Sequence, residues 1–143
     1  MSVLSSAALR LIPAALIFNS AIGKLGMDAE ASAGLQQFAA TGIKAMEKLP
    51  SDKFAKIIGT SEIAVGSALV APFVPNRLAG AALTAFGSGL LTLYFNNEDN
   101  TLEDGIRPSD AGLPLAKDSW LVAIGLGLLL SETGKESKKG FFS

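Results

Sequence analysis

Two apolar runs decide the fold of this chain: Ile57–Val74 (IIGTSEIAVGSALVAPFV) and Leu78–Phe95 (LAGAALTAFGSGLLTLYF). The short Pro75-Asn76-Arg77 connection joins them. As a helix, each run would rise about 27 Å, which is close to the thickness of the hydrocarbon core of a bilayer. The pattern therefore predicts a transmembrane hairpin. It carries one charge inside its spans, that of Glu62, which needs partners from the rest of the chain.

Two further apolar segments extend the hairpin to four predicted spans, at residues 7–27, 57–74, 78–95 and 113–130. Between the first two spans, Leu35, Phe38 and Met46 recur at helical spacing, which predicts an amphipathic helix that lies at the membrane surface or caps the bundle. The predicted fold is all-α, a four-helix transmembrane bundle with an interfacial amphipathic helix between helices 1 and 2. Residues 1–131 would form this domain, and 132–143 a polar cytoplasmic tail.

Composition limits the chemistry that this chain can perform. Of its 143 residues, 49% are hydrophobic and only 17% are charged, and the charges gather in a few segments, as in membrane proteins. Cysteine and histidine are absent, which excludes thiol chemistry, Cys or His metal sites, His-ligated haem and triads with a histidine base. We expect no metal site and no catalytic residue set, although an enzymatic role stays open. A net charge of −1 without a basic aromatic patch predicts no nucleic-acid partner.

The distribution of lysine and arginine predicts the orientation in the cell membrane. Arg10, Arg77 and the lysines of the tail lie on one side of the predicted bundle, and the acidic loop 96–117 lies on the other. The positive-inside rule then places both termini of this multi-pass protein in the cytoplasm. The four lysines of segment 28–56 would face outward, against the rule.

Small residues recur at intervals of four in two of the spans, which predicts close packing of helix backbones. The predicted seams are Gly80, Thr84 and Ser88; Ala81, Ala85 and Gly89; and Ala123 with Gly127.

Polar residues of four helices should meet in one layer. Helical rise places Lys24, Glu62, Tyr94 and Asp118 near the outer surface, with Asn19 deeper. A lone carboxylate in lipid would cost several kcal/mol, so Glu62 should face the interior and pair with Lys24. Three interpretations stay open: a structural ion pair that fixes helix register, a pocket in which these five residues hold a polar headgroup or a quinone-like ring, and a proton relay through Glu62.

Two arginines should lie near the opposite face of the membrane. Arg10 and Arg77 are expected to reach phospholipid headgroups and so to anchor the orientation of the bundle. A specific site for an anionic lipid or for a partner is the alternative.

Short motifs occur in the first three predicted spans: Arg10-Leu11, Phe18, Gly23-Lys24-Leu25, Glu62 followed by Gly66, and Arg77. Together they resemble the DoxX family of small four-helix membrane proteins. The resemblance covers roughly residues 7–95, and the fourth span fits in length. That family is named after a subunit associated with thiosulfate:quinone oxidoreductase. The resemblance therefore implies a membrane protein with a redox or quinone connection, without a defined catalytic set.

The sequence predicts a small accessory subunit of a larger membrane complex, with membrane lipids and other membrane subunits as partners. The alternative is a quinone- or lipid-binding subunit of a redox complex with a pocket at Glu62 and Lys24. A proton-coupled transporter is a third hypothesis. No intrinsic cofactor is expected apart from a bound quinone or lipid.

Overall fold

The computed structural model describes residues 2–131, and within them the fold is all-α. Thr101 and Pro108 form an isolated β-bridge in the long loop before the last helices. The predicted tail, 132–143, lies outside the described residues. In chain order the elements are α1 (Val3–Leu25), α2 (Ala29–Gly42), the 3-10 helix η1 (Lys44–Lys48), α3 (Phe54–Val70), α4 (Asn76–Phe95), the 3-10 helix η2 (Glu98–Asn100), α5 (Leu113–Ala116) and α6 (Ser119–Leu129).

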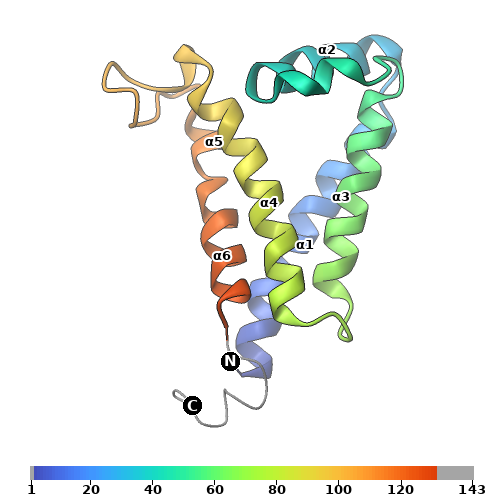
Figure 1. Ribbon diagram of the computed structural model, residues 1–143, viewed down its shortest axis with the longest axis vertical. Coiled ribbons are helices and arrows are strands. Elements are labelled where there is room, and N and C mark those ends of the chain that lie inside the picture. The colour runs from blue at the N-terminus through green and yellow to red at the C-terminus, as the bar shows by residue number, and fades with distance from the viewer. Residues whose placement is uncertain (1, 132–143) are drawn as a thin grey trace.

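Two helix pairs build the molecule. Helix α1 packs mainly on α3, and α4 packs mainly on α6. The pairs approach each other near the connection between α3 and α4, and α2 lies across the other end (Figure 1). Helices α3 and α4 are thus joined in the chain as the hairpin prediction required, but each has a different helix as its main neighbour.

The ends of the helices follow from prolines and from local hydrogen bonding. Helix α3 ends at Val70, before the predicted position, because Pro72 disfavours a helical conformation at Ala71, which is extended. The predicted 113–130 helix is present as α5 and α6. Between them the bonding tightens to i, i+3 spacing, since the N–H groups of Asp118 and Trp120 donate to Leu115 and Lys117.

Helices α1 and α4 have the length and hydropathy needed to cross a membrane, and only a minority of their residues are buried within the protein. In their most apolar windows, 22% of the α1 residues and 33% of the α4 residues are buried. Ile12, Leu16 and Ile22 of α1 are each more than half exposed, at 67%, 64% and 67%. A core helix of a soluble protein would bury such side chains, so α1 carries an exposed apolar surface of the kind found at membrane or protein contacts.

One face of α3 is shaped to receive α1. Gly59, Glu62, Gly66 and Leu69 recur at helical spacing along this face and are all buried. A Cβ on Gly66 would lie 2.8 Å from the ring of Phe18, so only glycine lets that ring lie against the helix. The glycines on both sides of Glu62 therefore allow α1 to approach the carboxylate closely.

The pair α4 and α6 packs backbone against backbone. A Cβ on Gly80 would lie 2.8 Å from Leu128 Cβ and closer still to the backbone of Gly125, and one on Gly125 would lie 2.7 Å from the Thr84 nitrogen. The predicted seam is thus correct at Gly80 and Thr84. The other proposed positions are exposed and lie outside this seam, namely Ala81, Ala85, Ser88, Ala123 and Gly127. Gly89 is half-buried, near the side chain of Ile43.

This seam predicts opposite effects of adding one methyl group to two glycines. Gly80→Ala should lower the melting temperature, because α4 and α6 must move apart, at a cost of about 1–3 kcal/mol. Gly127→Ala should leave it unchanged or raise it, since nothing lies within 4 Å of the added carbon and alanine favours helix. Thermal unfolding of the purified variants, followed by circular dichroism, measures both. Equal melting temperatures for the two would contradict the seam.

Candidate functional site

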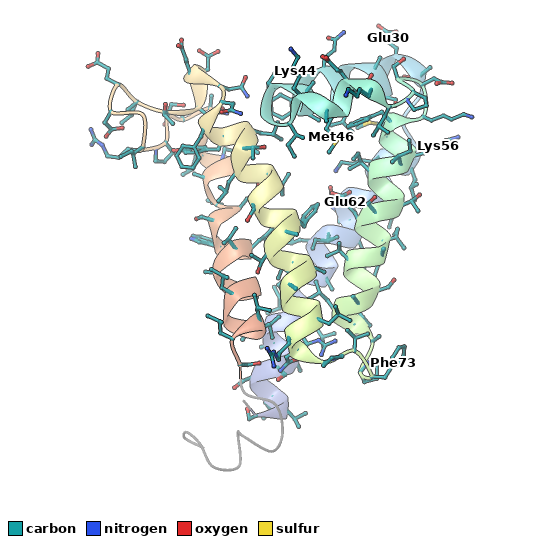
Figure 2. All side chains as sticks on the ribbon, in the orientation of Figure 1. Glu30, Lys44, Met46, Lys56, Glu62 and Phe73 are labelled. Atoms are coloured by element: carbon teal, nitrogen blue, oxygen red, sulfur yellow. The ribbon has the colours of Figure 1, made fainter. Side chains whose placement is uncertain are left out.

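A buried ion pair joins α1 to the middle of α3, below the level at which α2 crosses (Figure 2). Lys24 Nζ lies 3.1 Å from Glu62 Oε1 and 3.2 Å from Oε2. The Glu62 side chain is 2% exposed and that of Lys24 is 18% exposed. Ser20 Oγ lies 3.3 and 3.2 Å from the two carboxylate oxygens, and it also accepts a hydrogen bond from Lys24 Nζ. The expected pairing of Glu62 with Lys24 is therefore present, with Ser20 as a third member.

Helical spacing brings the three side chains together. Ser20 and Lys24 are one turn apart on α1 and project from the same face. On α3, Gly59 lies one turn before Glu62, and an added Cβ there would be 3.2 Å from the carbonyl oxygen of Ala21. This close approach puts the carboxylate within reach of two α1 side chains. Figure 2 shows Glu62 inside the molecule, whereas Glu30 and Lys56 lie at its periphery.

An open groove of about 830 Å³ ends at this ion pair. We call this cavity the groove, and it runs between α1, α4 and the α5–α6 segment. Its volume is in the range of known small-molecule sites, which are mostly apolar with a few convergent polar groups. Its polar lining comes from Ser20, Lys24, Glu62, Asp110, Lys117 and Asp118, and its apolar lining includes Ile12, Leu16, Ile17, Phe86, Leu90, Trp120 and Leu121.

The remaining predicted ligand-binding residues divide into three cases. Asp118 is half-buried and lines the groove together with the ion pair. The hydroxyl of Tyr94 instead donates to the carbonyl oxygen of Ile106, at 2.7 Å, and so holds the loop that follows α4. Asn19 is exposed and lines neither of the two cavities described here, because it lies on the opposite side of α1 from Ala21.

Arg10 is not at a lipid-facing surface, where the sequence placed it. It is buried, at 9% exposure, and its guanidinium makes five hydrogen bonds of 2.7 to 3.0 Å within the protein. All five of its N–H donors are thereby used, which leaves none for a phospholipid headgroup. The acceptors are the carbonyl oxygens of Ala68, Leu69, Ala71 and Val74 and the side-chain oxygen of Asn76.

These contacts explain why an arginine suits this position. The last carbonyl groups of a helix have no partner within it, and the C-terminal end carries partial negative charge. Arg10 supplies donors and positive charge to the end of α3 and also reaches the start of α4 at Asn76. Arg77 differs, since it is exposed at the beginning of α4, and headgroup contact there stays a prediction.

The loop after α4 is held by charge and by backbone bonds. The side chain of Arg107 donates to Asp104 at 2.6 Å, and the N–H groups of Ile106 and Arg107 each donate at 2.9 Å. These bonds, the side-chain bond first, lower the pKa of Asp104 to about 2. Asp104 therefore stays ionised at any physiological pH. Within residues 2–131 no group of three or more carboxylates is placed to hold a metal ion.

Replacing Arg10 should destabilise the protein far more than replacing Arg77. Arg10→Lys keeps the charge but cannot reach five oxygens, so we expect a loss of about 3 kcal/mol. Arg77→Lys, at an exposed position, should change the free energy of unfolding by less than about 0.5 kcal/mol. Equilibrium unfolding of the two variants compares them directly. Similar losses for both would show that the Arg10 bonds do not hold α1 to α3.

The ion pair should show strong coupling in a double-mutant cycle. Each single variant, Lys24→Met or Glu62→Gln, leaves a buried group without its partner and should lower the free energy of unfolding by about 3 kcal/mol. The double variant should lower it by much less than the sum of the two single losses. The exposed residues Lys56 and Glu30 give the control cycle, Lys56→Met with Glu30→Gln, which should be additive within about 0.5 kcal/mol. Additive losses at Lys24 and Glu62 would contradict the buried pair.

The site combines a buried charge pair with a large apolar surface. It can accept a hydrogen bond at the Glu62 oxygens and donate one from Lys24, while the groove accommodates apolar groups.

The chain matches no family model, no curated protein and no solved structure.

Proposed function

We propose that this protein is a small helical membrane protein that binds an amphiphile, a lipid or a quinone, with the polar group at Lys24 and Glu62. The observation that carries this proposal is a buried, hydrogen-bonded ion pair at the end of an open apolar groove. A polar group buried in such a place needs partners, and the pair supplies both a donor and an acceptor.

The exposed apolar helices support a location in the membrane. Helices α1 and α4 combine spanning length with an apolar surface that the chain itself leaves uncovered. In the proposal α3 and the α5–α6 segment cross beside them, each with a helical rise of about 25 Å. The beginning of α1 and the end of α6 lie at the same end of the molecule, and we propose that this end is cytoplasmic (Figure 1).

The placement of the motif residues supports a DoxX-like protein. Arg10, Phe18 and Lys24 lie on α1, and their contacts are with α3, where Phe18 packs on Gly66 and Lys24 pairs with Glu62. Residues far apart in the sequence thus serve one helix interface. A quinone or lipid ligand would agree with the redox connection that the resemblance implies.

Binding rather than catalysis is the role we propose for the site. The amine of Lys24, the hydroxyl of Ser20 and the carboxylate of Glu62 are already bonded to one another. Such a network suits the positioning of a polar group more than attack on a bond, because its members are engaged in the resting state.

An accessory subunit of a larger membrane complex is the second candidate function. Ala81, Ala85 and Ser88 form a small-residue stripe on the exposed side of α4, away from the seam with α6. Such stripes let another membrane helix approach closely. Crosslinking in native membranes tests this candidate: a specific enriched membrane protein would support it, and recovery of the chain alone would remove it.

The binding proposal predicts that a lipophile remains with the protein after gentle detergent extraction. Native mass spectrometry should show a bound lipid or quinone on the wild type. Glu62→Gln should reduce its occupancy at least tenfold, because the neutral amide no longer forms an ion pair with Lys24. Glu30→Gln, at an exposed acid of α2 outside the groove, should leave the occupancy unchanged.

A second readout uses the single tryptophan of the chain. Trp120 lines the groove, so a short-chain quinone or a brominated lipid bound there should quench its fluorescence in a saturable way. Equal occupancy and equal quenching in the wild type and in a folded Glu62→Gln variant would overturn the proposal.

A further inference from the structure

A second cavity meets the same ion pair from the side of α2. It has a volume of about 390 Å³ and lies beneath residues 29–48, which we call the roof. The roof contributes Leu35, Phe38, Ala39, Ile43 and Met46 to its lining. Figure 2 shows Met46 on the lower side of the roof, with Glu62 below it.

The two cavities share one boundary. Lys24 and Glu62 line both of them, and so do Phe86 and Leu90 of α4. Apart from the ion pair, Ser61 is the one polar residue among those that line the roof cavity. The ion pair thus lies between two largely apolar spaces, the groove between the helices and the cavity under the roof.

The roof is fastened at both ends, so the cavity beneath it is a built feature of the fold. At the α3 end, Ser32 donates to the carbonyl oxygen of Ser51 and accepts from the N–H of Ala55, while Gln36 donates to two carbonyl oxygens of the 46–49 segment. At the α4 end, the side chains of Asn96 and Asn97 donate to Gly42 and Thr41. Both buried polar side chains of α2 are used in these links.

We propose that the ligand has two apolar arms on one polar centre, with one arm in the groove and the other in the roof cavity. This inference rests on the proposed amphiphile-binding function and specifies its ligand class. A single anchoring pair can hold one polar centre, and apolar space opens on both sides of it. A ligand with one chain would leave the apolar lining of one cavity without ligand contacts, and would lose the dispersion energy that a second chain gains there.

The charge of the site indicates a polar centre without net charge. Lys24 and Glu62 neutralise each other and are the charged groups common to both cavities, whereas Asp110, Lys117 and Asp118 line the groove alone. A zwitterionic headgroup satisfies both partners, since its cation faces the carboxylate and its anion faces the amine. A diacyl phospholipid with an ethanolamine headgroup has this chemistry, and it serves as the probe.

The test compares two probes that differ by one acyl chain. Phosphatidylethanolamine and its single-chain lyso form, with identical acyl chains, are titrated into delipidated full-length protein in a non-ionic detergent. Wild-type protein should bind the two-chain probe at least tenfold more tightly. A quinone with one isoprenoid chain should behave as the single-chain probe does.

Filling the roof cavity should remove this preference without weakening the single-chain probe. Ala39→Trp places a large side chain in the roof cavity alone, and Ile43→Trp, at a more exposed residue of the same lining, does so if the first variant fails to fold. Leu16→Trp, in the groove alone, should weaken the single-chain probe as well.

The outcomes separate the two proposals. A two-chain preference that persists in the folded roof variants, or its absence from the wild type, would overturn the two-arm inference and leave the binding function standing. Failure of both probes and of the quinone to bind the wild type would overturn the binding function itself.

Discussion

The central constraint on this structure is that a carboxylate has been placed where neither water nor lipid can stabilise its charge. Removing Glu62 from water costs several kcal/mol, and this cost is offset only by a cation and by hydrogen bonds of good geometry. Lys24 and Ser20 of α1 provide both, which fixes the axial position of α1 against α3. Gly59 and Gly66, on either side of Glu62, make this contact possible, because a bulkier residue at either position would separate α1 from α3.

The two helix pairs are held by different physical means. Between α1 and α3 the ties are polar: Arg10 binds the carbonyl oxygens at the C-terminal end of α3, and Lys24 binds Glu62 at its middle. Between α4 and α6 the contact is apolar, through Gly80 and Gly125, and depends on close packing of the backbones. Both cavities lie between these pairs. The candidate site is therefore bordered on one side by the α1–α3 interface, which holds the ion pair, and on the other by the closely packed α4–α6 interface.

Much of this architecture could be predicted from the chain, because long apolar runs and a lone buried acid leave few alternatives. The helical segments and the pairing of Glu62 with Lys24 were accessible in this way, and Ser20, one turn before Lys24, could have been added. Arg10 was misplaced because burial of an arginine depends on free carbonyl groups at a helix end, which only the three-dimensional path of α3 creates. Asn19 was misplaced because depth along a helix does not determine the side it faces.

The candidate site was predictable at its centre, the pair Lys24 and Glu62, but the size of its cavities was not. The cavities depend on how far the helix pairs diverge and on where the roof crosses them, and the apolar pattern that predicts the helix of the roof does not give its position. An experimental density map of the extracted protein at side-chain resolution tests the central claim most directly. We expect elongated non-protein density in the groove, with its polar end within hydrogen-bonding distance of Lys24 or Glu62. A groove filled by the protein's own side chains, or a Glu62 carboxylate turned outward to lipid, would contradict it.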